Sequence, residues 1–281
     1  MPRRESSGHV FLERNHMRGR SKNSNGRRGS NPLLYLWSLG LVWLLWQGAL
    51  LALEDSARRF VLPTVGEVAT RLLKLLNDGS LLHHTGVTVL EMGLGLALGT
   101  GAALVLGYAV AHSRWFAHLL EPIIVTSQAM PIVALAPLLT IWFGPGLASK
   151  VLVCALIVFF PILVNVSTGL SHIDPGLQNV FRLLEATRWQ RFRLLEVPAA
   201  LPAFLTGLRV GGTLAAMGAV VGEFVASSEG LGYLVKQGQN LYDTSLMFVA
   251  ILTLTLLALA TYGTLGLIER KALKWRAVGK K

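Results

Sequence analysis

Few residues in this sequence stand at spacings that could support catalysis or metal binding. Gly144–Val151 resembles a phosphate-binding loop, but Ser149 occupies the place of its second glycine and Val151 that of its magnesium-binding hydroxyl, so we expect only a connecting loop. The neighbouring His83 and His84 lack the i, i+4 spacing of helical metal ligands. No nucleophile is accompanied by a recognisable base. The sequence therefore predicts no enzymatic activity, no metal and no cofactor.

The composition indicates that lipid, rather than water, is the main solvent of this chain. Of its 281 residues, 52% are hydrophobic and only 15% are charged, and the mean hydropathy is +0.52. Several apolar runs reach the roughly 20 residues that a helix needs to cross about 30 Å of hydrocarbon. These runs are continuous and lack the alternation of barrel strands. We therefore predict an all-α fold, a polytopic bundle of membrane helices.

Six spans are expected within a membrane domain covering residues 32–275, and an even number places both termini on one side. Basic residues in the N-terminal tail (1–31), the C-terminal tail (276–281) and the segment 172–201 favour the cytoplasm for all three. Segments 54–83 and 227–243 then face outward. The expected spans are approximately 33–53, 84–111, 119–142, 150–171, 202–226 and 244–268.

The N-terminal tail carries eight Arg and Lys residues against two Glu, with few apolar residues. Such a composition cannot build a core, so we expect disorder, with the basic charge setting orientation or touching anionic lipid. Nucleic-acid binding is the less favoured alternative. The following run, Leu33–Leu53, is too long and too far from the start for a cleaved secretory signal.

Local signals predict details of the helices. Thr64 followed by Glu67 is a capping-box pattern, so a short helix should begin there on the outer face. Gly95 and Gly99 form a small-xxx-small pair, which favours close packing of the second span against another helix. The single cysteine, Cys154, excludes an internal disulfide.

Prolines and uncharged polar residues indicate where a solute could pass. Pro122, Pro131 and Pro137 interrupt the third span and Pro161 the fourth, and carbonyls freed by proline line solute paths in some transporters. Kinks used only for packing are an equally good explanation. Polar residues at the same depth narrow the choice, and the candidate pathway residues are Thr126, Gln128 and Asn165.

The cytoplasmic segment 172–201 has the most distinctive pattern. Asp174-Pro175 is a helix-start signal, and the residues that follow are amphipathic with basic residues on one face. A helix lying on the lipid interface is one explanation. The segment also resembles the cytoplasmic loop of the binding-protein-dependent permeases of ATP-binding-cassette importers, whose signature is Glu-Ala-Ala, three residues, Gly, and a later Leu-Pro that opens the next span.

The match is best in the second half of the signature, at Glu185–Gln190 and at Val197–Pro202. Asn179 stands at the position of the family's first Glu, and Glu185 at that of its Gly. Shorter resemblances support the match from about residue 60 to 275, at Ala136–Gly144, Phe159–Asn165, Gly207–Arg209, Val221–Phe224, Gly230–Tyr233 and Glu269-Arg270.

Together the motifs resemble the branch that serves nitrate, sulfonate, taurine and bicarbonate, with permeases for thiamine pyrimidine precursors and riboflavin. The resemblance implies a multi-pass subunit of the bacterial inner membrane. It also implies a second permease subunit, expected to be an identical copy, two cytoplasmic ATPase subunits and an external solute-binding protein. The ATPase-coupling residues would be Glu185, Ala186, Thr187, Arg188 and Trp189, which would transmit closure of the ATPase dimer to the spans.

An ion-coupled secondary transporter is the alternative function. It requires an ionisable residue within the membrane as its coupling site. Glu91, Arg209 and Glu223 are the candidates, and an interhelical ion pair or an interface anchor is the competing explanation for each.

Overall fold

The computed structural model describes residues 37, 40–41, 43–48, 61–129 and 131–274. The chain divides into two compact units, Met1–Ala52 and Leu53–Lys281. In the first unit, the described residues 37, 40–41 and 43–48 are helical and belong to the expected first span. The predicted tails 1–31 and 276–281 lie outside the described residues.

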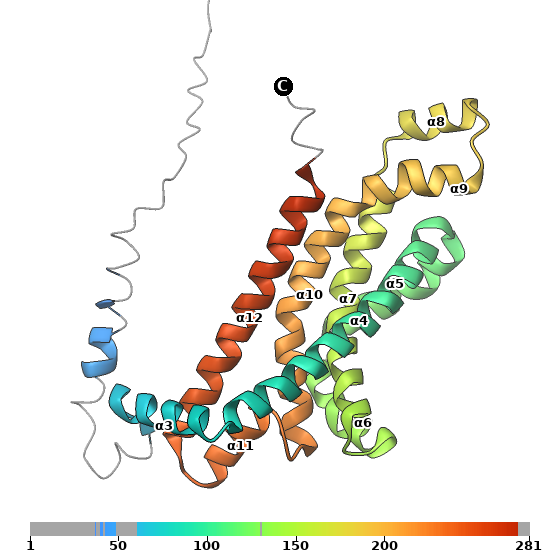
Figure 1. The fold of residues 1–281 in the computed structure, drawn as a ribbon. Helices are drawn as coiled ribbons and strands as arrows, with labels where there is room; N and C mark the ends of the chain where they lie inside the picture. The colour runs from blue at the N-terminus through green and yellow to red at the C-terminus, as the bar shows by residue number, and fades with distance from the viewer. Residues whose placement is uncertain (1–36, 38–39, 42, 49–60, 130, 275–281) are drawn as a thin grey trace, which may run out of the picture. The chain divides into compact units, whose positions relative to one another are not determined.

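The described part of the second unit is helical and contains no strand, which confirms the all-α prediction (Figure 1). In chain order the elements are α3 (Val65–Asn77), α4 (Ser80–His112), α5 (Arg114–Ala129), the 3₁₀ turn η1 (Ile132–Leu135), α6 (Ala136–Phe143), α7 (Leu147–Ser171), α8 (Pro175–Leu183), α9 (Arg188–Arg191), the π-helical turn η2 (Phe192–Glu196), α10 (Val197–Ala226), α11 (Leu231–Asn240) and α12 (Thr244–Ala272).

Four helices in the described part are long and apolar enough to cross a membrane: Ser80–His112, Leu147–Ser171, Arg188–Val225 and Thr244–Ala272. They correspond to the second, fourth, fifth and sixth predicted spans. The expected span 119–142 is not one continuous helix. It is divided into α5, η1 and α6, and Pro131 at the break has an extended backbone (φ −71°, ψ 91°). Proline lacks an N–H and disfavours helical geometry in the residue before it, which explains the interruption. The interruptions expected at Pro122 and Pro161 do not occur, because these residues lie inside the continuous helices α5 and α7.

Glycines allow α4 to lie directly against α7, as the small-xxx-small pair predicted. A Cβ atom placed on Gly99 would stand 2.6 Å from the carbonyl oxygen of Ala155, and one on Gly95 would overlap the side chain of Cys154. Helix α10 also approaches α7 closely, since a Cβ on Gly218 would lie 2.7 Å from the Cα of Cys154. The backbone of α7 is therefore closely packed against both α4 and α10.

The predicted helix start at Thr64 is confirmed. The Thr64 hydroxyl accepts the Glu67 N–H at 3.2 Å, and the Glu67 carboxylate accepts the Thr64 N–H at 2.7 Å, so both halves of a capping box are present. In contrast, the expected loop over Gly144–Val151 is wrong beyond Gly146, because α7 begins at Leu147. Lys150 therefore lies in the first turn of α7.

Two ion pairs join helices of the bundle. Lys150 Nζ lies 2.7 Å from Glu91 Oε1, which joins α7 to α4, and both side chains are buried. Arg209 of α10 lies 3.3 Å from the Glu269 carboxylate of α12 and stacks over the ring of Tyr262 at 3.9 Å. These contacts support the ion-pair explanation for Glu91 and Arg209.

Side chains from two other helices cap the N-terminus of α11. The Gly230 N–H donates to His84 Nδ1 at 3.0 Å, the Leu231 N–H to Thr88 Oγ1 at 2.8 Å, and the Gly232 N–H to the Glu223 carboxylate. Thr88 Oγ1 also donates to Glu223 Oε1 at 2.7 Å. Glu223 thus helps to satisfy helix-terminal donors that would otherwise be unpaired.

Candidate functional site

The segment 172–201 contains the short helices α8 and α9, the π-helical turn η2 and the first residues of α10, and α8 lies beyond the end of α7 (Figure 1). The predicted helix start is confirmed, because Asp174 Oδ1 accepts the Gly176 N–H at 2.7 Å and Pro175 is the first residue of α8. We call this segment the coupling loop, after the role that its resemblance implies.

A left-handed turn at Glu185 separates α8 from α9. Glu185 has φ +50°, its N–H donates to the Arg182 carbonyl at 3.1 Å, and the Ala186 N–H donates to the Phe181 carbonyl at 3.0 Å. This is the Schellman arrangement, in which the left-handed position is usually glycine. The bend is therefore formed with Glu185 in place of the glycine of the signature.

The predicted coupling residues form this turn and the start of α9. Thr187 caps α9, since its hydroxyl accepts the Gln190 N–H at 3.3 Å while the Gln190 side chain accepts the Thr187 N–H at 2.8 Å. Arg188 is exposed and Ala186 is half-buried. Thr187 thus has a local structural role, and Gln190 is a capping partner that the sequence reasoning missed although Thr-x-x-Gln is a capping-box pattern.

Large apolar side chains are exposed on both sides of the turn. Leu183 is 83% exposed, Leu184 is 72% exposed, and Trp189 is 66% exposed while stacking on Phe192 at a ring separation of 5.6 Å. Exposed apolar groups that cluster in this way mark contact surfaces. The sequence did not lead us to predict Leu183 and Leu184 as contact residues, although they directly precede the predicted residue Glu185.

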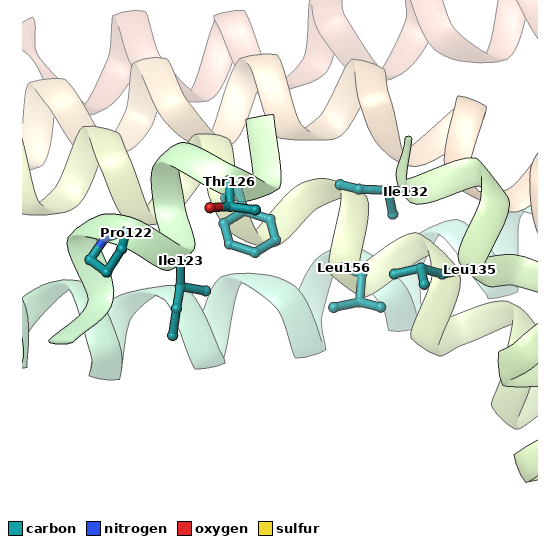
Figure 2. A pocket seen from close by; sticks show the side chains of 7 residues that line it. Pro122, Ile123, Thr126, Ile132, Leu135 and Leu156 are labelled. Carbon is teal, nitrogen blue, oxygen red and sulfur yellow. The ribbon is translucent and has the colours of Figure 1, made fainter. Parts of the chain in front are cut away.

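A cavity of about 360 Å³ lies beside the break between α5 and α6. Figure 2 shows that labelled side chains from α5, η1 and α7 surround it. Thr126 supplies a hydroxyl, and the other lining residues are apolar: Pro122, Ile123, Ile132, Leu135, Leu156 and Phe160. The cavity therefore adjoins an interrupted helix, as the prolines suggested for a solute path.

Asn165, the second candidate pathway residue, is not among the described residues that line this cavity. Asn165 Nδ2 donates to the Pro161 carbonyl at 2.8 Å, and a Cβ on Gly207 of α10 would lie 2.8 Å from the Asn165 Cβ. Asn165 is therefore at the contact between α7 and α10. Gln128 is in the last turn of α5, and its side chain lies outside the part of the chain that the structure describes.

Comparison with known proteins identifies the family. Residues 97–274 match the family described as "Binding-protein-dependent transport system inner membrane component". The chain is a member of this family. The match extends from within α4 to beyond the end of α12 and includes the coupling loop and the cavity, so both candidate sites belong to the shared permease domain.

Relatives and a solved structure agree with this assignment. The permease is 44% identical over 240 residues to the riboflavin transport system permease protein RibX of Chloroflexus aurantiacus, covering 85% of this chain and 89% of RibX. It is 33% identical over 249 residues to the formylaminopyrimidine transport permease protein ThiX of Halalkalibacterium halodurans, covering 87% and 95%. An inward-facing structure of the MetNI methionine ABC transporter is similar in fold, with a TM-score of 0.60 at 19% identity, covering 67% of this chain and 94% of that one.

The permease is thus the multi-pass inner-membrane subunit of an ATP-binding-cassette importer, and its helices form a membrane path for a solute. It is a non-enzymatic subunit, and ATP is hydrolysed by a separate ATPase subunit. The family also works with a solute-binding protein. These findings confirm the predicted importer role and replace the ion-coupled alternative.

Proposed function

We propose that this permease imports an organic solute with a flat, largely apolar ring, such as riboflavin, rather than nitrate, taurine or another small anion. The main observation that supports this proposal is the apolar cavity beside Thr126, because the described residues that line it supply one hydroxyl and no charge. An anion moved into such surroundings would lose its hydration without a compensating cation. A ring can instead contact Phe160 and the aliphatic side chains while the hydroxyl orients a polar edge.

The similarity to a relative named for riboflavin transport supports this choice, at 44% identity. The test is uptake by a bacterium that lacks its own transporters for these solutes and expresses the permease with its partner subunits. Labelled riboflavin should accumulate in an ATP-dependent manner, and excess taurine should not compete. Accumulation of taurine without riboflavin would contradict the proposed solute class while leaving the importer role intact.

We also propose that the turn formed by Glu185, Ala186, Thr187, Arg188 and Trp189 docks on the ATPase subunit. Exposed Trp189 supports this, since aromatic anchors dominate many interfaces, and exposed Arg188 is suited to pairing with a carboxylate. Ala186→Glu introduces a charge at a half-buried position beside this surface and should release the ATPase from membranes. Lys74→Ala, at an exposed position of α3, is the control and should retain it.

Retention of both the ATPase and transport in Ala186→Glu would exclude this turn as the docking element.

We also infer how the permease assembles and how it is oriented in the membrane. Two copies of the permease would pair in the membrane, with the coupling loop and both termini in the cytoplasm, and the basic tail 1–31 would contact anionic lipid. The basic residues of the tails and of segment 172–201 support this orientation.

A further inference from the structure

Glu196 is a buried carboxylate within the coupling loop, directly before the first residue of α10. It is the last residue of the π-helical turn Phe192–Glu196, and its side chain is only 4% exposed. Such turns are rare and are often found at functional sites. A buried carboxylate is tolerated only where partners compensate its lost hydration, so the identity of those partners is informative.

The partners of Glu196 come from two different elements. The Tyr108 hydroxyl donates to Oε2 at 3.1 Å, His112 Nε2 lies 3.0 Å from Oε1, and Arg191 Nε lies 2.9 Å from Oε1. Tyr108 and His112 belong to the last two turns of α4, whereas Arg191 is the last residue of α9. The carboxylate therefore connects the coupling loop directly to α4.

Aromatic contacts follow the same route. Trp189 stacks on Phe192 at 5.6 Å, Phe192 meets the Tyr108 ring edge-on at 5.7 Å, and Tyr108 stacks on His112 at 4.1 Å. A continuous series of ring contacts thus runs from the exposed side of the loop to the end of α4. The Glu196 carboxylate binds members of this series on the α4 side.

Helix α4 can carry a displacement away from this junction. It is packed against α7 through Gly95 and Gly99, and near its other end Thr88 holds the first turn of α11. A rigid helix with fixed contacts at both ends has the physical continuity that coupling between distant sites needs.

We propose that Glu196 is a positioning residue that transmits movement of the coupling loop to α4. The inference rests on the proposed docking of the ATPase at Glu185–Trp189. Without the carboxylate, the loop and α4 would share ring contacts but lose the ionic and hydrogen-bonded link. Docking would then persist while the movement of α4 weakened.

The test uses the full-length permease assembled with its ATPase subunits in lipid nanodiscs. A nitroxide is attached through a cysteine at Leu194 in the loop or at Ala102 on α4, both exposed positions, while native Cys154 is buried. ATP should change the spectrum at both positions in the parent protein. In Glu196→Gln the response at Leu194 should persist, and the ATP-driven population shift at Ala102 should fall by roughly 2- to 30-fold, the range typical of coupling residues.

Two further variants separate this role from general helix packing. Tyr108→Phe removes one donor, and its effect should not add to that of Glu196→Gln because both act on one contact; it also serves if Glu196→Gln fails to fold. Glu269→Gln is the control, since it breaks the pair with Arg209 between α10 and α12 and should leave the Ala102 response unchanged.

If the Ala102 response in Glu196→Gln is normal while the ATPase stays bound, the proposed role of Glu196 is overturned and the docking proposal still stands. An equal loss in Glu269→Gln would also overturn that role, because the effect would then be general. Retention of both the ATPase and transport in Ala186→Glu would instead overturn the docking at Glu185–Trp189 on which the inference rests.

Discussion

Replacing Glu185 by glycine should stabilise the turn between α8 and α9. Glu185 has φ +50°. For a residue with a Cβ atom this left-handed conformation is unfavourable by about 1–2 kcal/mol, whereas glycine has no Cβ and adopts it without this penalty. Glycine loses more backbone entropy on ordering, about 0.5–1 kcal/mol. The midpoints of these two ranges leave a net gain of about 0.75 kcal/mol, which is roughly a three- to fourfold change in the equilibrium for opening the turn.

Amide hydrogen exchange of the purified permease measures this gain. The Ala186 N–H, which donates to the Phe181 carbonyl at 3.0 Å, reports opening of the turn. In Glu185→Gly its exchange should slow roughly three- to fourfold. Glu185→Ala is the matched control, because alanine removes the charge but keeps the Cβ, so its exchange should resemble that of the parent.

Equal slowing in Glu185→Ala and Glu185→Gly would show that the charge, rather than the backbone conformation, determines the stability of the turn. Faster exchange in the glycine variant would refute the reasoning altogether. A second turn of the same kind offers an independent check, since Tyr242 follows α11 with φ +54°.

Three further outcomes are expected. Trp189→Ala should weaken binding of the ATPase by about 2 kcal/mol or more, at least tenfold in Kd, in a titration of the purified subunits, with normal insertion of the permease. Gly99→Leu should lower the midpoint of thermal unfolding, because its Cβ would meet the Ala155 carbonyl oxygen at 2.6 Å, whereas Gly101→Leu, with no atom within 4 Å of the added Cβ, should not. In intact cells a cysteine at Asn77 should react with an impermeant thiol reagent and one at Asn179 should not; the reverse pattern would contradict the proposed orientation.

The sequence alone was sufficient for the features that depend on neighbouring residues. Continuous apolar runs identify membrane helices because each residue contributes to transfer into lipid wherever the helix packs. The capping box at Thr64 and Glu67 and the start at Asp174 were also predictable, since a cap involves residues within one turn. Proline correctly predicted the interruption at position 131, but not the continuity of the helices through Pro122 and Pro161.

Contacts between distant segments were decided by the tertiary structure. Glu91 and Lys150 are 59 positions apart, and Tyr108 and Glu196 are 88 apart. Whether two such side chains meet depends on the rotation and register of whole helices, which local patterns do not specify. From the sequence alone, Glu91 was therefore compatible with an ion pair, an interface anchor or an ion-coupling site.

The candidate pathway residues also show which features the sequence predicted and which only the tertiary structure decided. Thr126 and Asn165 were equivalent as uncharged polar residues near prolines. Thr126 of α5 lies at a cavity that residues of α7 also line. The packing of α7 against α10 instead places Asn165 beside Gly207, and its amide donates to the Pro161 carbonyl. Composition determined that these polar groups lie within the helical bundle, and only the tertiary packing determined which of them faces an open space.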